Sequence, residues 1–549
     1  MEIQALNSEK KELLGKILFG ISILFLIYMI FTPLNQYFIH TDEYFTAALI
    51  RQSLGDIINL TAADVHPPLY YLLVKVLLKG LSLLNIKYNL TVVLKLISVI
   101  PYFFILLISW FKLRKEYGWF VIGLFCFVLA LISEFFIYFI LARMYSWGLL
   151  FLFLGFLCFR DILNKSDIKS WVLFTLFAVL AAYTHYFVAL SFGILYLLLF
   201  VYYVAIYGVK NNKISIGSLS FNEKSSLNEK VAVNEFRLKN EFLKLFSSMV
   251  LSIVLYIPWI NVLLNQISYV KNYFWVEPIG INDVFSFSVY FAYPKFSLVK
   301  LNLFGILSLI SMVFFIYLLI SYLRHSKEDS PKERYFILSG FLLYFLTIVL
   351  GTFLSVIYKP ILIQRYLIPS SAIIWFTLIV LIDKLRNRKL LFLSLVLILI
   401  LSVNGISLIA ETTNDLYSKG YDDAKFWSEI NNGKNIVIID PCTLLIYGPY
   451  LNETSQYCCG VNDIGIDMNH LKRLNDFNVV SLNETKVIIE KNKDKKDIYI
   501  FKYIDSKEIM KDNGKTYFPL KDGDNIEYIE VKPKHSISKN RYFRFYKVL

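Results

Sequence analysis

Charged residues are scarce in this 549-residue chain. Only 18% of the residues are Asp, Glu, Lys or Arg, whereas 57% are hydrophobic and 17% are aromatic. About a quarter of an ordinary soluble domain is charged, so the composition excludes a soluble enzyme and a disordered protein. Long apolar runs recur instead from residue 17 to about residue 409, which indicates a polytopic membrane protein.

Cysteine is also rare. The five cysteines are too few for a secreted scaffold built on disulfides. Cys126 and Cys158 lie in apolar runs and are expected only to pack, whereas Cys442, Cys458 and Cys459 lie in the hydrophilic C-terminal part and are candidates for a disulfide.

The net charge is +14, which on a soluble protein would suggest nucleic acid. No spacing typical of an RRM, a KH domain or a zinc finger occurs in the sequence. Lys and Arg also collect in the cytoplasmic loops of membrane proteins, and this explanation fits the apolar runs. We therefore expect no nucleic-acid partner.

Eleven apolar segments are candidates for crossing a bilayer, which takes about 20 helical residues. They lie near residues 17–33, 91–111, 119–140, 146–159, 171–184, 187–207, 246–264, 301–322, 335–357, 367–382 and 390–409. A further apolar stretch, residues 67–85, carries Lys75 and Lys79 on one helical face, which favours an amphipathic helix in the membrane interface. This assignment also keeps most loop Lys and Arg residues on one side, as the positive-inside rule requires.

The resulting topology gives a cytoplasmic N-terminus (1–16), a membrane domain (17–410) whose first extracytoplasmic loop covers 34–90, and an extracytoplasmic C-terminal domain (411–549). Glycosylation sequons at Asn452 and Asn483 agree with an outer C-terminal domain. In that domain 435–440 and 497–503 have the composition of strands. The sequence therefore predicts an all-α polytopic domain of about 11 transmembrane helices, followed by a small α/β domain, in a multi-pass cell membrane protein.

The long first outer loop holds several candidate residues, and loops of this length are often functional. Asp42 and Glu43 follow the first span in HTDEY, and His66 and Tyr70 belong to DVHPPLYY. Neighbouring side chains on a helix point about 100° apart, so at most one of the two carboxylates is expected to face a given cavity. The alternatives are a solvated helix start for the carboxylates and a helix-entry role for His66, ahead of two prolines.

Three further polar motifs fall at the outer ends of predicted spans. They hold Arg143 and Tyr145 (RMY), His185 (THYF), and Arg365 and Tyr366 (QRYLIP). Each alone could be an interfacial anchor, because Tyr and Arg favour that depth. Together they could surround the head group of a lipid phosphate, which arginine binds through its planar fork.

The order of these motifs resembles that of GT-C membrane glycosyltransferases. The DE pair opening a long outer loop, HPPLYY before an amphipathic helix, the Arg-x-Tyr turn and the late Arg-Tyr-x-x-Pro are similar to ArnT-like and protein O-mannosyltransferase-like enzymes, including the RgtA/B/C/D-like group. The resemblance covers residues 10–410, and the domain 411–549 carries no signature of the family.

The resemblance implies transfer of a sugar, with inversion, from a polyprenyl-phosphate donor (dolichyl or undecaprenyl) in the membrane lipid to an extracytoplasmic hydroxyl of a protein, lipid or glycan. Asp42 matches the family's general base, and Val65 stands where ArnT-type enzymes carry a second acid, which argues against an aminoarabinose substrate. His66 stands where those enzymes place a lysine. The residues expected to be catalytic are Asp42, Glu43 and His66, and those expected to bind substrate are Arg143, Tyr145, His185, Tyr70, Arg365 and Tyr366.

Two alternatives concern metal and function. A metal-free site is favoured, and the alternative is a divalent cation held by Asp42, Glu43 and His66. A transporter or flippase of lipid-linked sugars would place its ionisable groups near the middle of the membrane, and a membrane assembly factor would bind partners through the outer domain. Convergence of Asp42, His66, Arg143 and Arg365 on one outward cavity would favour the transferase.

Overall fold

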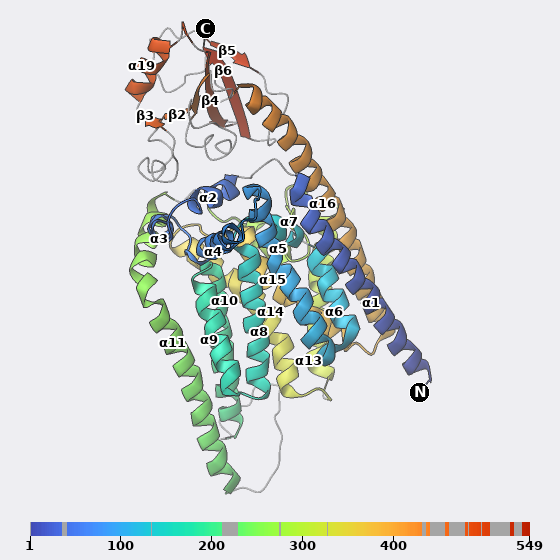
Figure 1. Cartoon of the computed structure of the whole chain (residues 1–549). Coiled ribbons are helices and arrows are strands. Elements are labelled where there is room, and N and C mark those ends of the chain that lie inside the picture. The colour runs from blue at the N-terminus through green and yellow to red at the C-terminus, as the bar shows by residue number, and fades with distance from the viewer. Residues whose placement is uncertain are drawn as a thin grey trace. The chain divides into compact units, whose positions relative to one another are not determined.

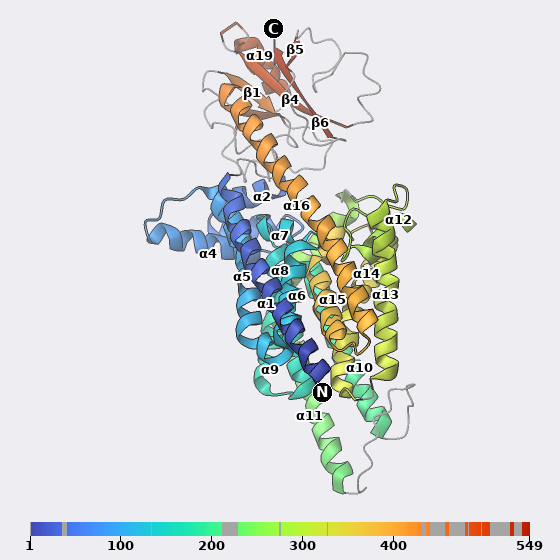
Figure 2. The ribbon, with the colours of Figure 1, turned by 90° about the vertical axis from the view of Figure 1, so that its right-hand side faces the viewer.

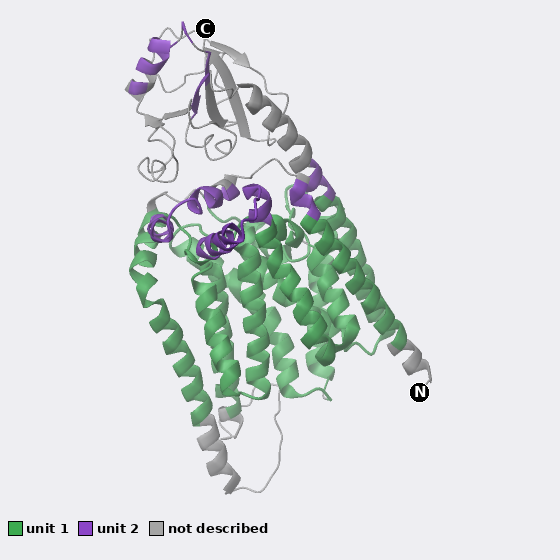
Figure 3. Cartoon of the chain, viewed as in Figure 1, with its two compact units in different colours: residues 1–30, 64–70, 96–409 green, residues 31–63, 71–95, 410–549 purple. Residues whose placement is uncertain are grey.

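The chain folds into two compact units, which Figure 3 distinguishes by colour. Unit 1 comprises residues 1–30, 64–70 and 96–409, and unit 2 comprises residues 31–63, 71–95 and 410–549. The computed structural model describes residues 2–35, 41–132, 134–210, 229–273, 276–326, 328–430, 435–439, 456–459, 478–480, 482–492, 494–495, 497–505, 528–531 and 541–548.

Unit 1 is a bundle of helices that run roughly alongside one another (Figures 1 and 2). All or most of each of the following elements belongs to it: α1 (Glu2–Phe31), α5 (Leu90–Ile108), the π-helical turn η2 (Ser109–Leu113), α6 (Arg114–Leu131), α7 (Phe135–Ile140), α8 (Tyr145–Asn164), α9 (Ile168–Ala182), α10 (Tyr186–Lys210), α11 (Glu229–Tyr273), α12 (Ile281–Val289), α13 (Leu303–His325), α14 (Pro331–Ile357), the 3-10 turn η3 (Gln364–Leu367), α15 (Ile368–Asp383) and α16 (Arg388–Ile430).

The centre of unit 1 is formed by α8 and α15, which pack against each other. Nearly every side chain of these two helices is buried. Their sequences are apolar around the whole circumference, as expected for helices surrounded by other helices. Helices α11 and α13 are far more exposed, because their apolar side chains face the surroundings of the bundle, where a bilayer would lie.

Among the described residues, nine helical segments are long and apolar enough to cross a membrane. One of them, Leu90–Leu131, has 42 residues and contains the predicted span 91–111 and the larger part of the predicted span 119–140. It folds back on itself, since the Tyr102 hydroxyl of α5 donates to the Cys126 carbonyl of α6 at 3.1 Å and Gly118 between them has a positive φ of 78°. Helix α9 is apolar but only 15 residues long. These two features explain the difference from the eleven spans expected.

Polar side chains mark where several helices begin. Asp167 accepts a hydrogen bond from the Ser170 backbone N–H at 2.7 Å at the start of α9, and Ser330 accepts one from the Glu333 N–H at 3.2 Å at the start of α14. These contacts satisfy backbone donors that the first helical turn leaves unpaired. Pro331 follows the second cap, at a position where its fixed φ suits a helix.

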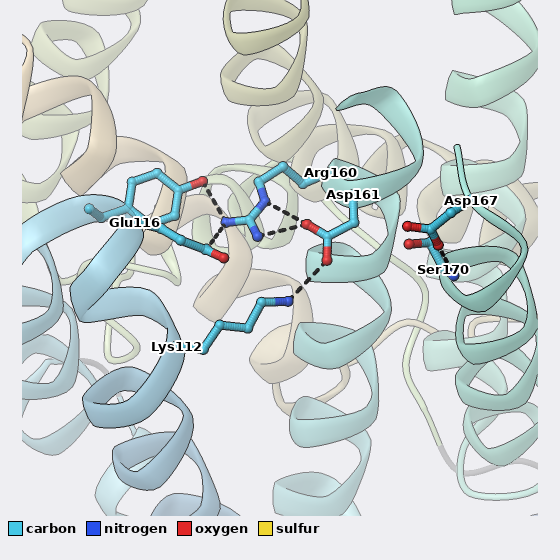
Figure 4. Close-up of polar contacts among 7 residues, drawn as sticks. Lys112, Glu116, Arg160, Asp161, Asp167 and Ser170 are labelled. Carbon is cyan, nitrogen blue, oxygen red and sulfur yellow. Dashed lines mark hydrogen bonds and ion pairs between the residues drawn. The ribbon is translucent and has the colours of Figure 1, made fainter. Parts of the chain in front are cut away.

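A polar network lies near the C-terminal end of α8 (Figure 4). The Arg160 guanidinium contacts Glu116, donates to the Tyr117 hydroxyl at 3.1 Å and to Asp161 at 2.7 Å, and Lys112 also donates to Asp161 at 2.9 Å. The positive charges are thus paired in a connected set rather than left isolated, which is the arrangement that makes partly buried ions tolerable.

The crossing of α1 and α6 depends on two glycines. A methyl group at Gly123 would overlap the backbone of Gly15, and one at Gly15 would overlap the backbone of Trp119. Small residues of this kind allow helix backbones to approach closely in a membrane.

We therefore expect Gly123→Ala to destabilise the bundle by about 1–3 kcal/mol, because the added methyl forces the two backbones apart. Gly20→Ala, on α1 where a methyl meets nothing within 4 Å, is the matched control and should leave the thermal midpoint unchanged or slightly raised. Thermal unfolding in detergent measures both variants. Equal midpoints for them would contradict the close packing of this crossing.

Unit 2 contains η1 (Thr32–Asn35), α2 (Thr41–Leu49), α3 (Leu54–Ala62), most of α4 (Leu69–Leu83) and the C-terminal sheet. With 15 residues, α4 is not one of the candidate spans, as predicted, and its position in the membrane interface stays a prediction. In this helix Lys79 is exposed, whereas Lys75 is partly buried and donates to the carbonyl of Ile50 at 2.7 Å. Of the two lysines, Lys79 therefore faces solvent, whereas Lys75 contacts the backbone at the end of α2.

The C-terminal sheet has the strand order β3-β2-β1-β4-β6-β5. Its elements are β1 (Ile436–Ile439), β2 (Gln456–Cys459), β3 (Asn478–Val480), α19 (Leu482–Asn492), β4 (Ile498–Asp505), β5 (Tyr528–Val531) and β6 (Arg541–Val548). The buried strand β1 pairs in parallel with β2 and β4, and β6 is antiparallel to both β4 and β5. Strands β1 and β4 coincide with the two strands predicted from the sequence, and the small α/β domain is confirmed.

The C-terminal cysteines and sequons are only partly covered by the described residues. Cys442 and Asn452 lie outside them. Cys458 and Cys459 belong to β2, and Asn483 belongs to α19, but the placement of their side chains is also outside the description. The disulfide and the two glycosylation sites stay predictions.

Candidate functional site

Four polar or aromatic residues of unit 1 meet beside the beginnings of its helices. His66 stands three residues before α4, Tyr145 opens α8, His185 joins α9 to α10, and Tyr366 lies in η3 just before α15. The starts of α8, α10 and α15 therefore lie at the same end of unit 1. Helix α8 is about 30 Å long at 1.5 Å per residue, so this end is far from the Arg160 network.

His185 is at the centre of this cluster. Its ring centroid lies 4.6 Å from that of Tyr366 in an edge-on arrangement, 5.6 Å from that of Tyr145 and 5.8 Å from that of His66. All four side chains are buried. The structure thus brings together four residues that the sequence predicted for one site, although up to 300 positions separate them.

The charges of Arg143 and Arg365 lower the pKa of both histidines of this cluster. Burial is the main cause that lowers the pKa of His66 well below 6.5 and that of His185 to about 3, and the positive charges of Arg143 and Arg365 lower both pKa values further. Both guanidinium groups are therefore within electrostatic reach of both rings. At neutral pH the two imidazoles are uncharged, and the positive charge of this group comes from the arginines.

The hydrogen bonding of His185 defines its tautomer. The backbone N–H of Phe187 donates to Nδ1 of His185 at 3.2 Å, so the single proton of the neutral ring is on Nε2. This Nε2 is buried and has no hydrogen-bond partner among the described residues. A buried donor without an acceptor costs about 1–3 kcal/mol, and an anion in the cluster would relieve that cost.

Glu134 is a site residue that the sequence analysis missed. It lies between α6 and α7 and accepts a hydrogen bond from the Tyr290 hydroxyl at 2.9 Å. Its carboxylate also accepts a hydrogen bond from Tyr138, and the charges of Lys295 and Arg365 act on it. The carboxylate is therefore within electrostatic reach of Arg365. A single acid inside the apolar run 119–140 was the available signal, because ionisable groups in such runs are commonly functional.

Tyr70 is buried in unit 1. Its hydroxyl lies 3.4 Å from that of Ser98 on α5. Its expected contact with a substrate stays a prediction.

Asp42 and Glu43 occupy the first turn of α2 in unit 2. Glu43 is fully buried and pairs with the equally buried Lys95, with 3.2 Å between Oε2 and Nζ. Asp42 is partly buried. Within unit 1, Arg143 and Arg365 are within electrostatic reach of His66. The shared outward cavity and the participation of Asp42 stay predictions.

The described residues contain no group of three or more His, Cys, Asp and Glu side chains placed to hold a metal ion. The alternative cation site at Asp42, Glu43 and His66 has its residues in two units, and it stays a prediction.

The fold belongs to a known structural class of multi-pass membrane proteins, the GT-C class. The chain superposes on the crystal structure of ArnT from Cupriavidus metallidurans in the apo state with a TM-score of 0.52 and 12% identity, covering 96% of this chain and 98% of that one. The structure of the same ArnT bound to undecaprenyl phosphate gives a TM-score of 0.52 and 10% identity, covering 96% and 97%.

No protein-family model matches the sequence, and no curated protein is similar to it in sequence. At identities of 10–12% the structural similarity establishes the fold alone. The GT-C resemblance inferred from the sequence motifs is thereby confirmed for the fold, and the reaction has to be argued from the residues of the site.

Proposed function

We propose that the protein is a membrane glycosyltransferase that takes a sugar from a polyprenyl-phosphate donor and transfers it to a hydroxyl on the extracytoplasmic side. The observation that carries the proposal is the cluster of two arginines and two neutral histidines at one end of an apolar bundle. Such a cluster suits an anionic head group whose hydrocarbon tail stays in the bilayer. The ArnT neighbour that binds undecaprenyl phosphate supports the same class of donor.

The phosphate end of the donor is assigned to unit 1. Arg143 and Arg365 would bind the phosphate oxygens, because guanidinium groups present paired N–H donors to such anions. The Nε2–H of His185 would donate to a further oxygen. When the sugar leaves, negative charge grows on the phosphate, and donors already oriented toward it stabilise the transition state, commonly by several kcal/mol.

The base is assigned to Asp42. The acceptor oxygen attacks the anomeric carbon while its proton passes to the Asp42 carboxylate, and the bond from that carbon to the phosphate oxygen breaks with its electron pair staying on the phosphate. Attack from the face opposite the leaving group inverts the anomeric centre. Tyr145, Tyr366 and Tyr70 are assigned to the walls of the donor site.

The site is assigned to the outer face of the membrane, with the N-terminus in the cytoplasm and the domain 411–549 outside. The support is the charge distribution. The cluster contains two arginines, whereas five basic residues lie at the opposite ends of α8 and α15: Lys11, Lys112, Arg160, Lys332 and Lys384. Positively charged residues favour the cytoplasmic side.

A transporter of lipid-linked sugars is a weaker explanation. Transport sites are usually built from ionisable groups and broken helices near the middle of the membrane. The residues Arg143, His185 and Arg365 stand instead at helix starts, as expected for chemistry at the membrane surface.

The deciding experiment uses the full chain in lipid nanodiscs with a panel of dolichyl-phosphate- and undecaprenyl-phosphate-linked hexoses and pentoses. The release of free polyprenyl phosphate is measured with pooled membrane lipid, glycan and protein acceptors. We expect release from at least one donor, with the sugar recovered on an acceptor. Translocation of these donors across liposomes without any release would instead establish a flippase.

The two buried histidines predict a pH dependence of stability. Their pKa values in the folded protein lie below the unfolded value near 6.5, so between these values the unfolded chain binds more protons, and stability falls as the pH falls below about 6.5. His185 then costs up to about 2 kcal/mol at pH 5, and His66 adds to the loss in the same direction.

Thermal unfolding from pH 7.5 to pH 5 measures this loss. His185→Gln should reduce it, whereas His325→Gln, at an exposed position of α13, should not. Bound undecaprenyl phosphate should also reduce the loss of stability between pH 7.5 and pH 5, because the anion offsets the arginine charges and raises the pKa of both histidines. An unchanged pH slope in His185→Gln would contradict a neutral buried His185.

A further inference from the structure

Glu43 and Lys95 form an ion pair that is closed to solvent. Their exposed fractions are 1% and 2%, and 3.2 Å separates Oε2 from Nζ. Taking two charges out of water costs several kcal/mol each, and Lys95 stands in an apolar stretch where leucine or methionine would pack more simply. A pair of this kind is a weak source of stability but an effective way to fix one arrangement of two helices.

A second lysine holds the other end of α2. Lys75 donates to the carbonyl of Ile50, the residue that follows α2, at 2.7 Å. The carbonyls at a helix C-terminus lack partners within the helix and favour a positive charge. Between the two lysine contacts, the Phe45 ring lies 6.0 Å from that of Tyr71 on α4. Residues of α4 and of the start of α5 therefore restrain α2 along its length.

These restraints determine where Asp42 points. A helix of nine residues is too short to be stable by itself, so its rotation about its own axis has to be set by neighbours. Successive side chains diverge by about 100°, so the direction of Glu43 toward Lys95 sets the direction of Asp42. Because Glu43 is engaged with Lys95, it is not available as a second base.

We propose that Glu43 and Lys95 are a positioning pair, which fixes the rotation of α2 and thereby aims the Asp42 carboxylate, and that Glu43 takes no part in the chemistry. The inference rests on the proposed function, in which Asp42 is the base. It replaces the catalytic role that the sequence suggested for Glu43.

The test is a double-mutant cycle with Lys95→Met, Glu43→Leu and the double variant, all in the full chain in nanodiscs. Each single change leaves one charge buried without its partner, whereas the double change replaces both by apolar groups, which is often tolerated. Three quantities are measured: the thermal midpoint, the turnover of the donor and the affinity for undecaprenyl phosphate. Lys79→Met, on the exposed side of α4, is the control.

Each single variant is expected to unfold at a lower temperature and to turn over about 100-fold more slowly, because a mispositioned catalytic group has effects of this size. The double variant should unfold at the same temperature as the unmodified protein and turn over at least about tenfold faster than either single variant. The acidic limb of its pH–rate profile should match that of the unmodified protein. Its affinity for undecaprenyl phosphate should stay within about threefold of the unmodified protein, since the proposal affects only the base.

A double variant that folds but is as inactive as Asp42→Asn would overturn the proposal, because Glu43 would then act in the chemistry. So would a double variant that fails to fold, or a Lys95→Met variant with normal midpoint and turnover. The proposed function fails separately, if the unmodified chain releases no polyprenyl phosphate from any donor. In that case the three thermal midpoints still measure whether the pair fixes α2.

Discussion

Asp42→Asn is expected to lower the turnover of the donor by about 10²–10⁴, the range that a positioned general base contributes. Asparagine has nearly the same shape as aspartate but accepts no proton at neutral pH, so the acceptor hydroxyl loses its base while α2 keeps its fold. The thermal midpoint and the affinity for undecaprenyl phosphate should be close to those of the unmodified protein. Initial rates of polyprenyl phosphate release measure the effect.

The matched control for this variant is Asp56→Asn on the neighbouring helix α3. It makes the same chemical change at an exposed position, where the Asp56 carboxylate accepts a hydrogen bond from the capping residue Ser53. Its turnover should stay within about twofold, since exposed substitutions seldom matter. Normal turnover in Asp42→Asn would remove Asp42 from the role of base.

Arg365→Ala is expected to raise the requirement for donor and to lower the turnover, together by about 10²–10³ in kcat/KM, because one preorganised donor to the developing phosphate charge is lost. Arg365→Lys should lie between, since it keeps the charge but not the planar fork. Rates measured over a series of donor concentrations separate the two effects. Arg324→Ala, at an exposed position of α13, is the control, and unchanged donor dependence in Arg365→Ala would exclude a phosphate role.

The same variant has a second consequence that does not depend on turnover. The charge of Arg365 lowers the pKa of His66 and His185, so its removal raises both values toward 6.5. The loss of stability between pH 6.5 and pH 5 should therefore be smaller in Arg365→Ala than in the unmodified protein. An identical pH slope would place the guanidinium away from the two rings.

The membrane part of the fold could be predicted from the sequence because its cause is local. About 20 apolar residues in a row suffice to span a bilayer as a helix, whatever the rest of the chain does. The stretch 67–85 was correctly separated from the spans. The two lysines on which that prediction rested differ in the structure: Lys79 is exposed, whereas Lys75 donates a hydrogen bond to the carbonyl of Ile50.

The candidate site could be predicted only in part. His66, Tyr145, His185 and Tyr366 were recognised because they belong to polar motifs whose order along the chain resembles that of GT-C enzymes. Glu134 was missed although it is the one acid in the apolar run 119–140, because its contact with Tyr290 joins positions 156 residues apart.

The class of fold, the helices and the residue types available for chemistry can be derived from the amino-acid sequence, since they follow from local apolar length and from motifs. Two features follow only from the folded arrangement: the Nε2–H of His185 lies in a buried cluster with two arginines in electrostatic reach, and Glu43 pairs with Lys95. Both outcomes depend on which helix ends meet in space. That meeting is set by side-chain packing between distant segments, which no pattern along the chain records.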